Sequence, residues 1–297
     1  MNKRITIASG KGGVGKSMIS SMISILFSKD NNVVAIDCDV DAPNLALWLG
    51  IDTSNKNLAD KTKFISTTKK PQIDKSKCNN CGKCVQKCNF DALEKGKSYP
   101  KLISYRCEGC QLCKIVCPNN AIKMVSVKNC LLSIFQTDYN FSVIQGQIQP
   151  GEAESGEAVT EIRKYANSIS RKDSIFIQDA AAGIGCPVIA SIVNSNYVII
   201  VAEPSKSSFS DMNRIIRVIN QFEIPYGIVI NKYGLNNNIS NEIIKQSKNN
   251  FLGKVSYDQE IIKSIVNMTP IFETNLKAKK EIKDIFKKVN DLIFNDK

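Results

Sequence analysis

Hydrophobic and polar residues along the chain alternate in a pattern typical of strands and helices that follow one another. Residues 4–9 form a short apolar run that predicts a strand, and residues 17–28 carry apolar side chains on one helical side. Residues 33–36 predict a second strand. The same rhythm returns after residue 140, with strands expected at 175–178, 197–201 and 226–230, each before a helical pattern. This alternation predicts an α/β fold with a mostly parallel sheet covered by helices on both faces.

Between these two parts, the chain has a different residue composition. Residues 52–77 are polar and rich in lysine, and residues 78–117 hold eight of the 11 cysteines. Their spacing repeats after 29 residues, since Cys78, Cys81, Cys84 and Cys88 recur as Cys107, Cys110, Cys113 and Cys117. We therefore expect a small inserted module at residues 71–125, within an α/β domain formed by residues 1–70 and 126–297.

Composition narrows the class of protein. The chain has 297 residues, 43% hydrophobic and 23% charged, which is typical of globular proteins. Its first apolar stretch is too short for a signal peptide, and no run is long enough to span a membrane, so we expect a cytoplasmic protein. There is no histidine, which excludes His-based triads and His-ligated zinc.

The formal net charge is +12, and an excess of positive charge can indicate a protein that binds nucleic acid. The lysine runs lack interleaved aromatic residues and a recognisable reader fold, so we predict no nucleic-acid partner and interpret them as solvated faces. The last helical stretch carries Ile282, Ile285, Phe286, Val289, Leu292 and Ile293 on one side. Because this helix is needed to cover the sheet, we predict no stable membrane insertion.

The first predicted strand leads into a glycine-rich loop with the spacing G-x-x-x-x-G-K-[ST]. Glycines let backbone N–H groups turn toward phosphate oxygens, and the following helix adds its positive end. Lys16 would reach the β- and γ-phosphates, and the Ser17 hydroxyl would bind Mg²⁺. The alternative is a purely structural turn, which the strand–loop–helix context disfavours. The predicted nucleotide-binding residues are Gly10, Gly12, Gly13, Val14, Gly15, Lys16, Ser17 and Met18.

Three aspartates follow predicted strands and would lie beside this loop. Asp37 and Asp39 come after the second strand, and Asp179 ends the apolar run at residues 174–178. Taken singly, each could cap a helix. Taken together at neighbouring strand ends, they offer the anionic partners that a metal ion and an attacking water need.

The additional lysine, Lys11, makes this loop resemble the deviant Walker A motif of the superfamily that includes MinD, ParA, Mrp and the nitrogenase iron protein. The resemblance implies an ATP-sandwich homodimer in which Lys11 contacts phosphate across the interface. By the same match, residues 37–44 resemble switch I, with Asp37 holding Mg²⁺ through water and Asp39 orienting the attacking water. Asp179 then corresponds to switch II.

Asn231 closes another predicted strand, where this fold places its base-recognition loop. A guanine-binding protein would carry Asp three residues later, and here that position is Gly234. Adenine is therefore the preferred base, with Asn231 as its contact by resemblance. A polar turn without a ligand is the alternative.

The two cysteine runs each have the spacing C-x2-C-x2-C-x3-C, which is the bacterial ferredoxin signature. In that pattern three cysteines of one run bind a [4Fe–4S] cluster and the fourth binds the other cluster. One predicted set is Cys78, Cys81, Cys84 and Cys117, and the second is Cys107, Cys110, Cys113 and Cys88. Zinc is disfavoured because a ribbon would present C-x2-C pairs. One departure is Asn89 after Cys88, where the signature has the proline that Pro118 supplies after Cys117.

With this insertion the chain resembles MinD-superfamily ATPases that contain a ferredoxin module. The resemblance implies an ATP-hydrolysing iron–sulfur protein that transfers electrons to or from a redox partner protein. A cluster carrier of the Mrp type, with a cluster-accepting protein as partner, is the alternative. Such a carrier needs labile clusters on a C-x-x-C at a dimer interface, whereas this chain offers four ligands for each cluster.

Three cysteines lie outside the two runs. Cys186 is seven residues past Asp179, like a cluster ligand of the nitrogenase iron protein, but the second cysteine that such a bridge requires would fall near Ala153. We therefore expect Cys186 to be a small buried residue. Cys38 and Cys130 are also expected to be buried.

Overall fold

The computed structural model describes residues 2–54, 59–152 and 156–294. Its main sheet has nine strands in the order β11-β10-β9-β1-β8-β2-β7-β6-β3, and the seven from β11 to β7 are parallel. These parallel strands are β1 (Lys3–Ser9), β2 (Val33–Asp37), β7 (Ser142–Ile148), β8 (Ile175–Ala182), β9 (Tyr197–Ala202), β10 (Tyr226–Tyr233) and β11 (Phe251–Ser256). The predicted α/β fold with a mostly parallel sheet is confirmed.

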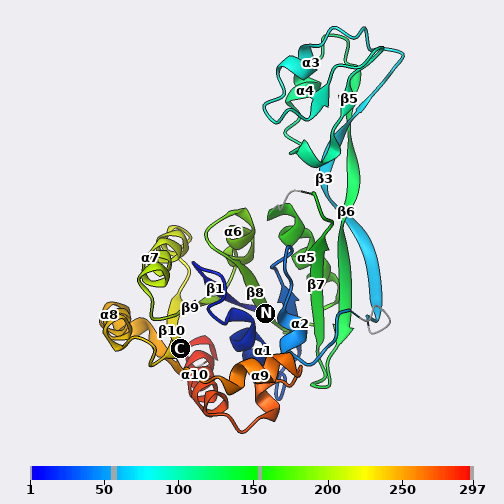
Figure 1. Ribbon diagram of the computed structural model, residues 1–297. Coiled ribbons are helices and arrows are strands. Elements are labelled where there is room, and N and C mark those ends of the chain that lie inside the picture. Colours follow the sequence, from blue (N-terminus) through cyan, green and yellow to red (C-terminus); the bar gives the residue numbers. More distant parts are fainter. Residues whose placement is uncertain (1, 55–58, 153–155, 295–297) are drawn as a thin grey trace.

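Helices cover both faces of the sheet (Figure 1). One face packs against α1 (Lys16–Phe27), α2 (Leu45–Trp48), α9 (Glu260–Val266) and α10 (Lys277–Phe294). The other face packs against α5 (Gly156–Ile169), α6 (Cys186–Ile192), α7 (Lys206–Gln221) and α8 (Asn237–Ser247). Strand residues are buried on both sides, which explains their continuous apolar sequence.

The remaining two strands form a long antiparallel ribbon that the sequence pattern did not predict. β3 (Lys61–Ile73) pairs with β6 (Ile122–Gln136), and β6 also pairs with β7. Cys130 of β6 lies opposite Ile148, the last residue of β7, so the ribbon continues about eight residues, or about 25 Å, past the sheet. It runs through the expected domain bounds at residues 71 and 125 without a break.

The tip of the ribbon carries residues 74–121, called here the cysteine module (Figure 1). It contains the short helices α3 (Lys83–Gln86) and α4 (Leu112–Ile115), the strand pair β4 (Leu93–Glu94) and β5 (Lys101–Leu102), and a 3₁₀ turn, η2 (Ser104–Arg106). Since β3 runs in the same direction as the parallel strands, the module projects from the edge of the sheet at which those strands end.

Two helix expectations need correction. In α1 nearly every residue is buried, not one side only, because α10 packs against the side that faces away from the sheet, with the Phe27 and Phe286 rings 4.7 Å apart. In α10, Ile282, Ile285 and Val289 are buried as expected, but Leu292 is exposed near the helix end. No described helix is long and apolar enough to cross a membrane.

The described chain also contains two more 3₁₀ turns, η3 (Lys248–Asn250) and η4 (Ile271–Glu273).

Candidate functional site

The glycine-rich loop connects β1 to α1, as its spacing predicts. Gly15 caps the helix in a left-handed conformation, with φ +94°, which favours glycine. The side chain of Asn231 lies against Gly15, and its amide donates a 2.8 Å hydrogen bond to the carbonyl oxygen of Val14. Lys16, the first helical residue, is 8% exposed. The loop therefore places backbone N–H groups and a buried cation at the start of one helix, the arrangement that binds phosphate.

Asp37 is the last residue of β2 and is the register partner of Asp179, which lies within β8, three residues before that strand ends. Both are buried. Burial raises the pKa of Asp37 well above its ordinary value, and the neighbouring charge of Asp179 raises it further. Burial also raises the pKa of Asp179, while the Lys16 charge and hydrogen bonds from Ser17 and Ser20 oppose that rise. A divalent cation near these carboxylates would relieve their repulsion.

The carboxylate of Asp37 also organises the loop that follows it. It accepts hydrogen bonds from the backbone N–H groups of Asp39, Asn44 and Leu45, at 3.0, 2.8 and 2.9 Å. The last two are N–H groups at the beginning of α2, so Asp37 also acts as a helix cap. Asp39 is only partly buried, and burial raises its pKa, which the positive charge of Lys16 opposes. The predicted residues Lys16, Ser17, Asp37, Asp39 and Asp179 therefore form one cluster of mutually interacting side chains.

A cavity beside the loop could accommodate a nucleoside. It encloses about 1010 Å³ of empty space, open mouth included. Its walls come from widely separated segments: Gly13, Gly15, Met18, Trp48, Asn231, Lys232, Leu235, Ser256, Tyr257, Asp258, Ile261, Ile262 and Ile265. Gly13, Gly15, Met18 and Asn231 are predicted from the sequence, whereas Trp48, Leu235 and the segment 256–265 are not. Trp48 ends α2, the segment 256–265 runs from the end of β11 into α9, and no motif marks these residues in the sequence.

The side chain of Lys11 forms an ion pair within its own chain. Its ammonium group lies 2.9 Å from Glu203, which also pairs with Lys232 at 2.8 Å. Burial alone would raise the pKa of Glu203, but hydrogen bonds and charge from Lys232 and Lys11 hold that pKa below its ordinary value. Lys232 also donates to the carbonyl oxygen of Gly13. This ion pair, which the sequence pattern did not reveal, holds Lys11 within its own chain.

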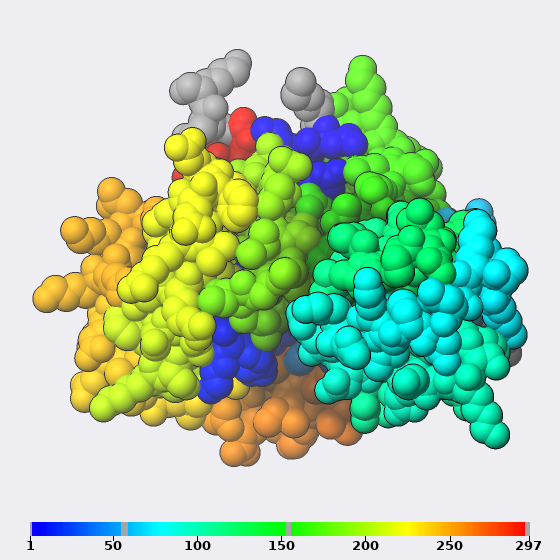
Figure 2. Space-filling model, turned by 90° about the horizontal axis from the view of Figure 1, so that it is seen from above, coloured from blue at the N-terminus to red at the C-terminus, as the bar shows by residue number. Residues whose placement is uncertain are grey.

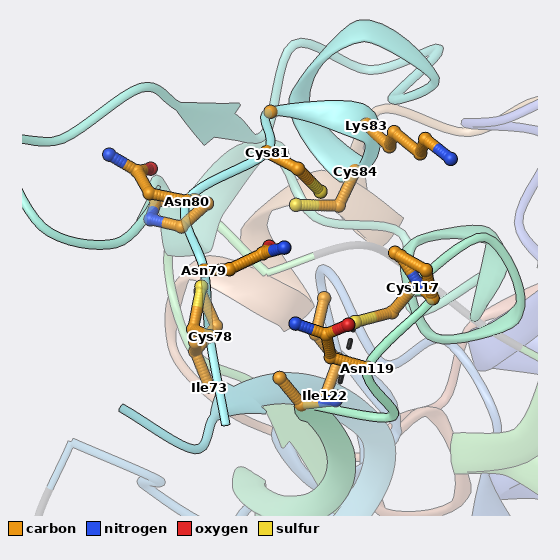
Figure 3. Close-up of a pocket in the computed structure, with 14 residues that line it drawn as sticks. Ile73, Cys78, Asn79, Asn80, Cys81, Lys83, Cys84, Cys117, Asn119 and Ile122 are labelled. Atoms are coloured by element: carbon orange, nitrogen blue, oxygen red, sulfur yellow. Dashed lines mark hydrogen bonds between the residues drawn. The ribbon is translucent and has the colours of Figure 1, made fainter. Parts of the chain in front are cut away.

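The eight cysteines of the two runs divide between two cavities of the cysteine module. One, with about 350 Å³ of empty space, has Cys78, Cys81, Cys84 and Cys117 in its walls. The other, with about 340 Å³, has Cys88, Cys107, Cys110 and Cys113. Figure 3 shows the first cavity, where three cysteines of one run and Cys117 of the other surround a common space. Each cavity therefore takes three thiols from one run and one from the other.

The backbone repeats along with the cysteines. The helices α3 and α4 are related by the 29-residue offset, and Gly82 and Gln111 before them are both left-handed. The N–H of Ala92 donates to the Sγ of Cys88 at 3.3 Å, and the N–H of Ala121 donates to the Sγ of Cys117 at 3.2 Å. Such N–H bonds to sulfur are among the features that tune iron–sulfur clusters.

Within the described residues, no group of three or more Cys, Asp or Glu side chains converges as the ligands of a single metal ion do. The cysteines instead line the walls of two similar cavities. Four thiols on the walls of one cavity fit a sulfur-ligated cluster better than a single zinc ion, whose thiolate ligands lie about 2.3 Å from the metal.

The three other cysteines differ in exposure. Cys38 and Cys130 are buried, as expected, and burial raises the pKa of each thiol, to about 12 and about 11. The expectation for Cys186 was wrong, because Cys186 is exposed. It begins α6, where its backbone packs against Gly156 while its side chain faces solvent. The position near Ala153 lies outside the described residues.

Comparison with known proteins identifies the family of the chain. The profile of the CobQ/CobB/MinD/ParA nucleotide binding domain matches residues 5–271, and the chain belongs to this family. An uncharacterized protein of Methanocaldococcus jannaschii is 35% identical over 98% of this chain and 97% of its own. An ATP-binding protein of the same organism is 28% identical, over 93% and 94%. Nitrogenase iron protein 2 of Methanobacterium ivanovii is 50% identical over 50 residues, which are 17% of this chain and 19% of that protein.

Solved structures show the same fold. MinD of Pyrococcus horikoshii, complexed with Mg-ADP, superimposes with a TM-score of 0.58 over 99% of this chain and 98% of its own, at 16% identity. A plasmid partition protein of Borrelia burgdorferi, bound to AMPPNP, reaches 0.60 over 99% and 100%, at 19% identity.

Proposed function

We propose that this protein binds and hydrolyses ATP, and that its nucleotide state controls electron transfer through two [4Fe–4S] clusters. One observation carries the proposal: a nucleotide-binding domain of this family extends a two-stranded ribbon to two cavities that are each lined by four cysteines. A positioning ATPase without redox chemistry would leave those cavities without a role.

In the nucleotide half, the start of α1 and Lys16 would hold the phosphates. Ser17 and Asp37 would bind Mg²⁺, in the case of Asp37 through water, and Asp179 would support it through its contacts with Ser17 and Ser20. Asp39 is partly exposed and has a raised pKa, properties suited to orienting and polarising a water molecule. Asn231 braces the loop through Val14 and borders the cavity proposed for adenine.

Dimerisation would complete this site. In the proposed ATP-bound homodimer, Lys11 of each subunit contacts the phosphates bound by the other. Because Lys11 is paired with Glu203 in the single chain, that contact requires the pair to open. The Glu203 pair then keeps Lys11 withdrawn when no partner subunit is present.

In the module, the two cysteine sets would each hold one cluster, and bound clusters supply one-electron transfer. Cys84 is buried, whereas Cys81 and Cys110 are exposed. Exposed ligands at the tip of a ribbon suit electron exchange with a redox partner protein. The rival function, delivery of clusters to an accepting protein, requires weakly held clusters, and four thiols for each cavity disfavour it.

The test is anaerobic purification of the full chain, followed by iron analysis and EPR. About eight irons per chain and cubane signals on reduction are expected for two clusters. Cys88→Ala and Cys117→Ala should each remove one cluster and spare much of the other. Stoichiometric zinc in place of iron would exclude the iron–sulfur half of the proposal.

Control by nucleotide is tested separately, by redox titration without nucleotide, with ADP and with a non-hydrolysable ATP analogue. Potentials that differ between these states support electron transfer gated by ATP, since linkage makes the coupling reciprocal. Identical potentials in all three states, together with transfer of clusters to an apo acceptor, would favour the carrier.

A further inference from the structure

A buried ion pair joins the cysteine module to the nucleotide-binding domain. Lys70 lies in β3, where the lysine-rich sequence predicted solvated side chains, yet it is 3% exposed. Its ammonium group lies 2.6 Å from Glu152, in the loop that follows β7. It also donates to the carbonyl and hydroxyl oxygens of Ser104, at 2.9 and 2.8 Å. One buried cation therefore contacts both the body of the protein and the module.

On the module side, Ser104 links this cation to Cys107, a cysteine of the second cavity. The carbonyl oxygen of Ser104 accepts one hydrogen bond from Lys70 and another, at 3.1 Å, from the backbone N–H of Cys107. The turn that carries Ser104 also approaches the body, because Tyr105 lies close to Gly151. The first cavity has no Lys70 contact of this kind among the described residues, so the arrangement is one-sided.

On the nucleotide side, Glu152 is linked to the loop that contains Asp39. The N–H of Ile148 donates to the carbonyl oxygen of Val40, next to Asp39, at 2.9 Å. Four residues later the chain reaches Glu152, whose N–H bonds back to Gln149 at 3.1 Å. Asp41 and Glu152 also line one cavity, of about 870 Å³ of empty space. A movement of residues 39–41 would therefore displace the segment that holds Glu152.

We propose that the Lys70–Glu152 pair is the joint through which the nucleotide site sets the potential of the second cluster, the one held by Cys88, Cys107, Cys110 and Cys113. This inference rests on the proposed function. A buried positive charge favours the reduced, more negative cluster, and Glu152 partly neutralises that charge. Displacing Glu152 changes how much of the Lys70 charge the cluster experiences. Figure 2 shows the cysteine module, in cyan to green, beside the blue chain near the N-terminus when the molecule is seen from above.

The test uses charge changes of opposite sign. Lys70→Met removes the cation and should lower the potential of the second cluster. Glu152→Gln leaves Lys70 without its neutralising partner and should raise it. A tenfold change in the reduction equilibrium of a one-electron couple corresponds to 59 mV. Lys69→Met is the matched control, because Lys69 is the neighbouring residue on the same strand and is exposed.

The clusters are resolved by making each change in Cys117→Ala, which keeps the second cluster, and in Cys88→Ala, which keeps the first. Opposite shifts confined to the second cluster, with a smaller effect of Lys69→Met, support the joint. Shifts of the same sign, equal shifts in both clusters, or a Lys69→Met effect as large as that of Lys70→Met would overturn it. A merely structural role would loosen the module and move both variants in one direction.

A second set of measurements compares the potentials of the two clusters between the nucleotide states. In Glu152→Gln, the difference in the second cluster's potential between the nucleotide states should shrink, while that of the first cluster is unchanged. Hydrogen exchange at residues 104–107 gives a readout without iron: both variants should exchange faster there, and Lys69→Met should not. If the wild type holds no iron or shows no nucleotide effect, the proposed function fails. If it shows both and Glu152→Gln changes neither the potential nor the exchange, only the joint fails.

Discussion

Replacing Gly15 with alanine should weaken ATP binding through two separate effects. The first is backbone strain, because Gly15 has φ +94°, where an L-residue costs about 1–2 kcal/mol. The second is a collision, because a Cβ at this position would lie 2.2 Å from Nδ2 of Asn231. Moving that amide breaks its 2.8 Å bond to Val14, which costs about 0.5–1.5 kcal/mol.

A loop that relaxes in the free protein must regain this conformation to bind phosphate, so the two effects, about 1.5–3.5 kcal/mol in sum, weaken Mg-ATP binding at most roughly 10- to 300-fold. Gly13→Ala is the matched control: its φ is +74°, but a Cβ there would have no atom within 4 Å. Gly13→Ala therefore introduces only the backbone strain, about 1–2 kcal/mol, and should weaken Mg-ATP binding only about 5- to 30-fold.

Calorimetric titration with Mg-ATP measures both dissociation constants. Asn231→Ala removes the collision partner, so in the double variant Gly15→Ala should do less harm than it does alone. Equal losses for Gly13→Ala and Gly15→Ala, together with additive effects in the double variant, would refute the bracing role of Asn231. Unchanged affinity in both glycine variants would refute the loop as the nucleotide site.

Three other predictions concern separate parts of the molecule. Lys16→Ala should abolish ATP binding, whereas Asp39→Ala should bind ATP and hydrolyse it far more slowly; normal hydrolysis by Asp39→Ala would remove that residue from catalysis. Ile285→Ala in α10 should lower stability by about 2–5 kcal/mol, and Leu292→Ala by about 0.5 kcal/mol or less, as measured by thermal unfolding; equal effects would contradict the packing of this helix. At pH 8 and with clusters retained, iodoacetamide should modify the exposed Cys186 but not Cys38 or Cys130. The latter two thiols are buried, and their raised pKa values, about 12 and about 11, keep them protonated. Mass spectrometry measures the modification, and a modified Cys38 would contradict the prediction.

The phosphate loop shows how far local sequence reaches. Glycines at positions 13 and 15 are needed for positive φ, and a lysine must begin the helix, so one short segment specifies its own conformation. The parallel sheet was equally predictable, because strands buried on both faces must be apolar throughout. The repeated cysteine spacing likewise predicted the two groups of four thiols that the cavities bring together.

The ribbon shows where local sequence is insufficient. β3 is rich in lysine and threonine, and much of it is exposed, so it lacks the apolar periodicity that predicts a strand. Its pairing with β6 is made by backbone hydrogen bonds between residues about 60 apart, which side-chain patterns do not encode.

The sequence by itself therefore determined the parallel α/β core, the phosphate loop and the grouping of the cysteines, because each depends on residues close in the chain or on a strict spacing. Only the tertiary structure decided that Lys11 is held by Glu203, that Asn231 braces Val14, and that Lys70 is buried against Glu152. These contacts join residues 192, 217 and 82 positions apart. Charge and polarity are visible in a sequence, but the partner that neutralises a charge is chosen by which chain segments the fold brings together.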